Sequence, residues 1–179
     1  MTDHPILTPD FAAIIQEMKL QTDTATAVVL ASRVEDWLGE ALKTKMRDDL
    51  SAKLKERLFQ GYGPLSTFSA KIDIAYAFSM VEPAIYNDLR AIKDIRNRFA
   101  HSKNVVHFQS AELVPYIQKL TGWKTDSDYT DLFIERCKEC IEACKPSLER
   151  AALAAAVREF KSQPAASLDN APDQSGAAE

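Results

Sequence analysis

The sequence predicts a soluble, all-α protein built as a bundle of about seven helices. The chain has 179 residues, enough for one domain with extensions, and its 46% hydrophobic and 27% charged residues are a globular balance. Only five residues are Gly, and the period-two alternation of strands is missing. Apolar side chains instead recur every three to four residues, which is the period of an amphipathic helix.

Two helices are predicted in the N-terminal quarter of the chain. Thr8-Pro9-Asp10 is typical of a helix start, with a capping side chain, Pro at the first position and an acid in the first turn, and predicts a helix to about Leu20. A longer helix from about Asp23 to Lys45 has the strongest amphipathic pattern of the chain. Its apolar face consists of Ala27, Leu30, Ala31, Val34, Trp37, Leu38, Ala41 and Leu42.

A short helix and a longer one follow, separated by a glycine-containing loop. Leu50, Leu54 and Leu58 mark the short helix, and Gly61 fits the position just past its end. Ser66 can cap the next helix. The expected buried stripe of that helix is Leu65, Phe68, Ile72, Ala75, Tyr76 and Ser79.

The C-terminal half predicts three more helices and a tail. They cover about 83–101, 110–120 and 127–161, and Pro146 should kink the last of them. Residues 1–161 thus form a single domain, whereas 162–179 are Ala, Ser, Pro and Asp with one Leu, a composition that predicts a disordered tail. The apolar stripe of 83–101 is Ile85, Leu89, Ile92, Ile95 and Phe99.

Composition excludes several classes of protein. The longest apolar run, 151–157, is too short to span a bilayer, and residues 1–10 have no secretory pattern. Three cysteines cannot close a disulfide framework, so we expect a cytoplasmic protein. The net charge of −4 lacks the basic excess of a protein whose whole surface binds nucleic acid.

Arg96 departs from plain amphipathicity. At 100° per residue it lies about 20° from Leu89 and about 40° from Ile92, inside the apolar stripe. An unpaired guanidinium there costs several kcal/mol, so we expect a carboxylate from a neighbouring helix or a second subunit to meet it. On that expectation, Arg96→Ala should cost roughly 3 kcal/mol or more, since the orphaned acid stays buried.

The spacing from Arg96 and Asn97 to His101 resembles the R-x4-6-H pattern of HEPN domains, which are all-helical and usually dimeric. In HEPN ribonucleases the pair implies metal-free RNA cleavage, in which His moves a proton at the 2′-hydroxyl and Arg holds the phosphate, here with Asn97 supporting. Arg96 and His101 lie about 140° apart on the helix, so they converge only by fraying or across a dimer. The structural alternative is a salt bridge at Arg96, with Arg98 and His101 favourably placed at a helix C-terminus.

A second resemblance covers about 25–108. The segments Phe59, 63–72, 86–89 and 92–101, with Glu35 and Leu38 in the preceding long helix, resemble the mannitol operon repressor family. Ser79 stands where a Gly is expected after the fourth helix. The resemblance implies an all-helical regulator of sugar-alcohol uptake genes without a recognisable DNA-reading module. Its signature or interaction residues here are Gly63, Pro64, Leu65, Ser66, Phe68, Ser69, Arg96, Asn97 and His101.

Other candidate sites have weak support. The basic stretch 43–57 is typical of a solvated surface and lacks a helix-turn-helix, whereas 90–107, at +4, is where RNA would bind if it binds at all. Cys137, Cys140 and Cys144 have a zinc-like spacing, but no fourth ligand lies close by and they continue a helical stripe, so we predict buried thiols. We therefore expect no metal and no cofactor.

These observations favour a homodimeric transcriptional repressor or corepressor of a sugar-alcohol operon. It would act through a protein partner, such as another transcription regulator, without membrane contact and without sequence-specific DNA binding. The alternative is a metal-independent HEPN-type ribonuclease that uses Arg96 and His101 with Asn97 supporting.

Overall fold

Six helices and no strand occur in the part of the chain that the computed structural model describes, residues 11–102 and 106–162, with side chains for 22–102 and 106–159. This confirms the all-α class predicted from the sequence, with six helices against about seven. The helices are α1 (Phe11–Lys43), α2 (Ala52–Phe59), α3 (Phe68–Ala77), α4 (Pro83–His101), α5 (Val114–Ile117) and α6 (Tyr129–Ser162). None of these helices is both long enough and apolar enough to cross a membrane.

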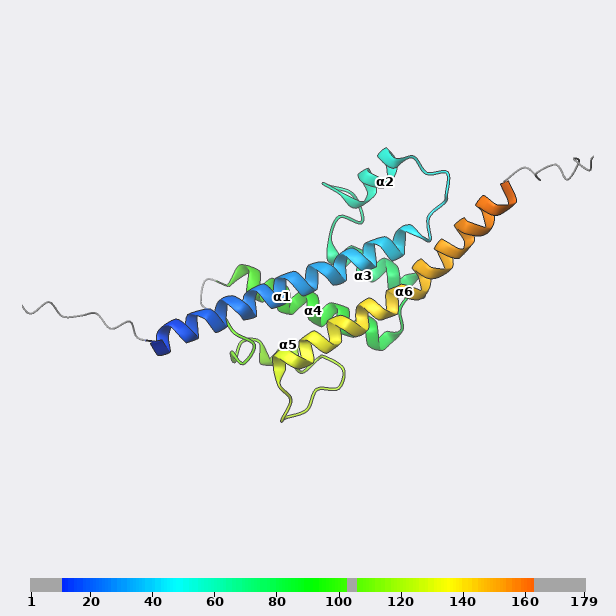
Figure 1. Ribbon diagram of the computed structural model, residues 1–179. Coiled ribbons are helices and arrows are strands. Elements are labelled where there is room, and N and C mark those ends of the chain that lie inside the picture. Colours follow the sequence, from blue (N-terminus) through cyan, green and yellow to red (C-terminus); the bar gives the residue numbers. More distant parts are fainter. Residues whose placement is uncertain (1–10, 103–105, 163–179) are drawn as a thin grey trace, which may run out of the picture.

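The bundle is formed by α1, α3, α4 and α6. α1 and α6 lie side by side and run in the same general direction, while α4 runs against them and α3 packs on α1 and α4 (Figure 1). Because the apolar stripes of these helices face one another, their side chains leave water together. Fully buried residues include Val34 and Leu38 of α1, Ile72 of α3, Leu89, Ile92 and Ile95 of α4, and Phe133 and Cys140 of α6.

The segment between α4 and α6 closes one side of the core. Phe108 lies between Phe99 and Phe133, with ring centroids 4.9 and 5.1 Å apart. The predicted helix 110–120 is reduced to the single turn α5, flanked by turns. Pro115 lies in the first two positions of α5, where a residue without an N–H is tolerated.

The predicted break between two N-terminal helices is wrong, because α1 is one continuous helix of 33 residues. No Gly or Pro lies between Leu20 and Asp23, so nothing in the backbone ends the helix there. Asp23 accepts a hydrogen bond from the backbone N–H of Phe108 at 3.2 Å, which ties this stretch to the segment after α4. The predicted start at 8–10 lies outside the described residues.

The helix starts and stops around α2 and α3 partly match the prediction. Ser51 caps α2, and Gly61 has a φ of +59°, which confirms the predicted glycine position after that helix. The cap of α3 is Thr67 and not Ser66: the Thr67 hydroxyl accepts from the N–H of Ala70 at 3.2 Å. The capping residue was therefore misplaced by one position.

The predicted buried stripe of α3 extends too far toward its C-terminus. Phe68, Ile72 and Ala75 are buried, but Tyr76 is exposed and stacks on Tyr86 of α4 with centroids 4.3 Å apart. Ser79 is also exposed. Its φ of +52° is a left-handed conformation that favours glycine, which explains why a Gly is expected at this position.

α6 agrees with the predicted seventh helix. Asp128 caps it by accepting the N–H groups of Thr130 and Asp131, at 2.9 and 3.0 Å. The helix continues through Pro146, so the proline does not end it. The predicted disordered tail falls largely on 163–179, outside the described residues.

Candidate functional site

The predicted carboxylate partner of Arg96 is Glu35, on the neighbouring helix α1. Arg96 Nη2 lies 3.3 Å from Glu35 Oε2, and Lys71 Nζ of α3 lies 2.7 Å from Glu35 Oε1. The three side chains, here called the Glu35 cluster, are 12–26% exposed. Arg96 therefore finds its acid within its own chain, and this arrangement needs no second subunit.

A second polar group of α4, Asp88, is fully buried and was missed by the sequence analysis. Its Oδ1 accepts the backbone N–H of Thr121 at 2.7 Å, while Oδ2 has no hydrogen bond in the described part of the chain. Arg136 Nη1 of α6 lies 3.9 Å from that Oδ2. Asp88, Thr121 and Arg136 are here called the Asp88 cluster.

Burial is the main influence on the Asp88 carboxyl. It raises the pKa of Asp88, although the Thr121 N–H and the charge of Arg136 act in the opposite direction. The helical period could have revealed this residue, because Asp88 lies about 20° from Ile95 on the α4 surface. The same angular argument that singled out Arg96 therefore applies to Asp88.

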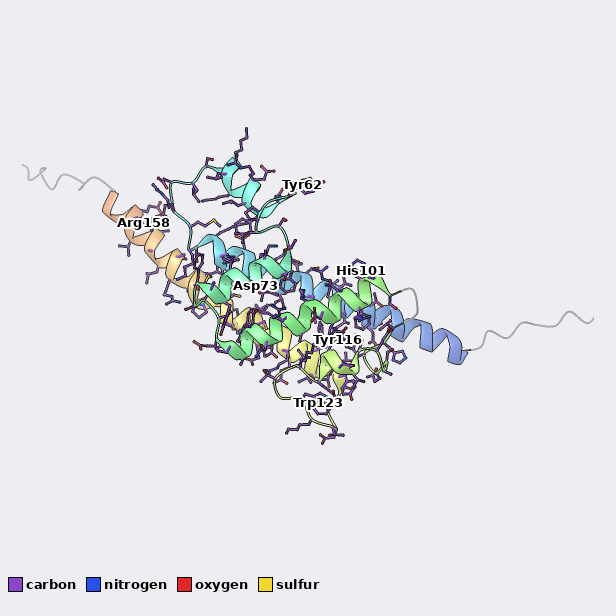
Figure 2. The ribbon with its side chains drawn as sticks, turned by 180° about the vertical axis from the view of Figure 1, so that it is seen from behind. Tyr62, Asp73, His101, Tyr116, Trp123 and Arg158 are labelled. Carbon is purple, nitrogen blue, oxygen red and sulfur yellow. The ribbon has the colours of Figure 1, made fainter. Side chains whose placement is uncertain are left out.

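His101 is exposed at the end of α4 (Figure 2). Together with Asn97, Arg98, Ser102 and Glu112 it lines a cavity of about 90 Å³. Asn97 and His101 thus share a cavity. Arg96 does not line it, since its guanidinium contacts Glu35 on another face of α4. Within one chain, the structure does not bring Arg96 and His101 together for catalysis.

The cations of the basic stretch 90–107 that the structure describes are engaged by other side chains. Arg90 contacts Asp73 at 3.3 Å, and Lys93 contacts Asp94 at 3.0 Å. Arg98 donates to the Tyr116 hydroxyl at 2.7 Å, and this hydrogen bond raises the pKa of Arg98. Arg90 and Arg96 are paired with acids from outside the stretch, so 90–107 presents less free positive charge than its sequence indicates.

The segment 63–69, singled out by the family resemblance, connects α2 to α3. A Cβ at Gly63 would lie 2.2 Å from the carbonyl oxygen of Arg57, so only glycine fits there. Leu65 and Phe68 are buried, whereas Pro64 is exposed and Ser66 and Ser69 are half-buried. The adjacent Tyr62 side chain is fully exposed and points away from the bundle (Figure 2). The residues of 63–69 therefore mainly form the turn between α2 and α3 and its contact with the core.

The three cysteines are buried thiols, as predicted. Burial raises the pKa of Cys137 to about 12 and that of Cys144 to about 11, and it raises the pKa of Cys140 as well. No group of His, Cys, Asp and Glu side chains in the described residues has the arrangement of a metal site. Thiols this far from ionisation are poor nucleophiles at neutral pH.

The fold and the site define an all-helical protein whose α4 carries paired and buried charges at the centre of the bundle. A family model described as Mannitol repressor matches residues 20–139, which is more than half of the chain, and the chain belongs to this family. The match includes both charge clusters and the turn at 63–69. Comparisons with curated proteins and with solved structures found no match.

Proposed function

We propose that this protein is a repressor or corepressor of a mannitol-type sugar-alcohol operon. The observation that carries the proposal is the family match over 20–139. The protein acts through contacts with another protein, such as a transcription regulator, and does not read operator DNA itself. Two features support this mode of action. Residues 1–161 are close to neutral, because three of the acids behind the net charge of −4 lie in 162–179, and most of the described cations of 90–107 are paired with acids.

The turn after α2 is exposed in a way that suits contact with a protein partner. α2 buries none of its residues and lies outside the bundle (Figure 1), and Tyr62 follows it with no part of its side chain covered. Exposed tyrosines are common anchors of protein interfaces. We propose that Tyr62 and its neighbours in this turn touch the partner.

The test is a reporter gene placed behind the sugar-alcohol promoter, in cells with and without the chain. We expect higher reporter expression without the chain, and repression restored by the wild-type chain. Tyr62→Ala should restore less repression, while Leu153→Ala, which removes another exposed apolar side chain, should restore it fully. Equal expression with and without the chain would reject the operon role.

Direct DNA reading is tested with purified protein. Specific binders favour their site over random DNA by at least about 10³ at near-physiological salt. We expect unrelated duplex to compete as well as the promoter fragment does. A strong preference for the promoter would reject the corepressor mode.

We also propose a homodimer, and light scattering should then give twice the mass of one chain.

The ribonuclease alternative makes a different prediction. A HEPN ribonuclease cleaves single-stranded RNA in EDTA, because His and Arg do the work of a metal. Since the Arg96 guanidinium is engaged by Glu35, we expect no such cleavage. Cleavage by the wild type that disappears in a folded His101→Ala variant would reject our proposal, and that comparison also controls for contaminating nucleases.

A further inference from the structure

A cavity of about 360 Å³ lies where the C-terminal end of α1 meets the second half of α6. The turn at 44–48 and Lys55 of α2 form one wall, and α6 from Ser147 to Arg158 forms the other. We call it the basic pocket. It lies at the opposite end of the bundle from His101, as the positions of Arg158 and His101 in Figure 2 show. It is therefore separate from the α4 clusters.

Positive charge dominates the walls of the basic pocket. One carboxylate, Asp48, lines it together with six cations. These are Lys43, Lys45, Arg47, Lys55, Arg150 and Arg158.

Three of these cations are compensated by nearby acids. Lys43 contacts Glu40 at 2.6 Å, Arg47 binds both carboxylate oxygens of Asp49, and Arg158 pairs with Asp48. The other three, Lys45, Lys55 and Arg150, have no carboxylate partner within the described residues. The pocket thus holds an excess of three positive charges.

Helix electrostatics account for only part of this excess. Lysines near the C-terminal end of α1 interact favourably with the negative end of the helix dipole, which explains Lys43 and Lys45. Lys55 and Arg150 come from two other helices, so this effect does not bring them to the same cavity. Convergence of cations from three helices on one cavity indicates an anionic ligand.

The remaining wall leaves space and offers hydroxyl groups. Ala151, Ala154 and Ala155 line the cavity with the shortest apolar side chain, so the volume stays open. Ser147 is nearly buried, and its hydroxyl makes no hydrogen bond with the described residues. The Thr44 hydroxyl donates to the Ala41 carbonyl at 2.7 Å, and its oxygen can still accept a hydrogen bond.

We propose that the basic pocket binds a small organic phosphate, that is, a phosphate monoester with a polar carbon skeleton. A monoester carries close to two negative charges at neutral pH, and the three uncompensated cations are enough to neutralise them. Arg150 Nε donates to the Pro146 carbonyl at 2.9 Å, which holds the guanidinium so that its terminal nitrogens can bind phosphate oxygens. The cavity is larger than one phosphate group, and Ser147 and Thr44 suit the hydroxyls of the attached skeleton.

This inference does not depend on the operon role. The α6 wall, 147–158, lies beyond the family match that ends at residue 139. Binding is measured on the purified full-length chain, with no promoter and no protein partner present. A failure of the reporter experiment therefore leaves this proposal standing, and the reverse also holds.

The experiment is calorimetric titration at constant ionic strength with three probes: glycerol 3-phosphate, inorganic phosphate and glycerol. Constant ionic strength separates specific binding from screening. We expect glycerol 3-phosphate to bind more tightly than inorganic phosphate, and glycerol not to bind. Arg150→Gln and Lys55→Gln should each weaken glycerol 3-phosphate binding about tenfold or more, since each removes a charge-assisted contact.

Matched controls remove the same charge elsewhere. Lys53→Gln on α2 and Lys138→Gln on α6 replace exposed lysines that do not line the pocket, and should leave the affinity unchanged. Circular dichroism verifies that all four variants are folded. Equal losses in pocket and control variants would show a general charge effect and overturn the proposal. Equal affinities for glycerol 3-phosphate and inorganic phosphate would also overturn it, because no carbon skeleton is then recognised.

The chain's own acidic C-terminal residues are the competing occupant. The variant that combines Asp169→Asn, Asp173→Asn and Glu179→Gln removes their charge. If this variant binds glycerol 3-phosphate and the wild type does not, the pocket serves these residues and the proposal is wrong. If neither protein binds it, the proposal is also wrong. Binding by both, lost in Arg150→Gln, supports it.

Discussion

The two charge clusters of α4 differ in how their buried groups are satisfied. In the Glu35 cluster, one carboxylate lies within 3.3 Å of two cations, and all three side chains keep some contact with water. In the Asp88 cluster, a fully buried carboxylate accepts one backbone N–H, and its nearest cation is 3.9 Å away. The first cluster is a salt bridge between helices, and the second is mainly a hydrogen bond to a loop.

The two clusters show that a charged side chain in this bundle can be either partly hydrated and paired with an opposite charge, or fully buried and held by a hydrogen bond. Long Lys and Arg side chains can reach a neighbouring helix and still keep their ends partly hydrated. A short Asp at the centre cannot do so, and burial raises its pKa. The stability contributed by the Glu35 cluster should therefore depend on its charges, and that of the Asp88 cluster on its hydrogen bond.

The largest effect should come from Glu35→Ala. This change leaves Lys71 and Arg96 partly buried, close together and without their acid, so we expect a loss of about 3 kcal/mol in the free energy of unfolding. Urea denaturation measures it. Glu40→Ala is the control, because Glu40 is an exposed acid of the same helix that pairs with the exposed Lys43, and it should cost about 0.5 kcal/mol or less. Similar losses in both variants would contradict a special role for Glu35.

Asp88→Ala should be the next most damaging change. It leaves the Thr121 N–H without an acceptor and opens a small gap in the core, for an expected loss of about 2 kcal/mol. Asp88→Asn keeps an acceptor oxygen and the same volume, so it should lose much less. If chemical denaturation shows equal losses for both variants, the hydrogen bond to Thr121 is not what the cluster contributes.

Arg96→Ala should cost about 1 kcal/mol, which is below the 3 kcal/mol expected from the sequence. The reason is that Glu35 keeps Lys71 at 2.7 Å, so the acid is not orphaned. A double-mutant cycle with Lys71→Ala checks this, since removing both cations should cost more than the sum of the single losses. A loss of 3 kcal/mol in Arg96→Ala alone would show that Lys71 cannot replace it.

Local signals in the sequence account for much of the fold. The structure has α4 at Pro83–His101, as predicted, because Pro83 marks its start and the apolar stripe continues to Phe99. The false break in α1 has a different origin. Thr22 and Asp23 are weak helix formers, but packing of the amphipathic face outweighs propensity in a bundle.

Partners distant in the sequence could not be predicted. The angular position of Arg96 required an acid, but Glu35 lies 61 residues away, and no local pattern identifies it among the acids of the chain. The basic pocket was even harder to predict, because Lys45 and Arg150 belong to separate amphipathic segments that meet only in the folded bundle. Asp88, by contrast, could have been identified from the sequence by the same calculation of helical angles.

The smallest expected effect is the pH dependence of the Asp88 cluster. The raised pKa of Asp88 means that the folded state holds this proton more tightly than the unfolded state, in which an Asp titrates near pH 4. Stability from this group is therefore fully present below about pH 4, and it is lost as pH rises through the folded-state pKa.

Asp88→Asn does not titrate at this position, so it isolates the effect from all other carboxylates. The free energy of unfolding of the wild type minus that of Asp88→Asn should fall as pH rises from about 4 and then level off. Urea denaturation at a series of pH values, with Asp73→Asn as an exposed control, measures this difference. A difference that grows with pH would mean that the Thr121 N–H and Arg136 outweigh burial. The Asp88 cluster would then be a charge-stabilised site like the Glu35 cluster.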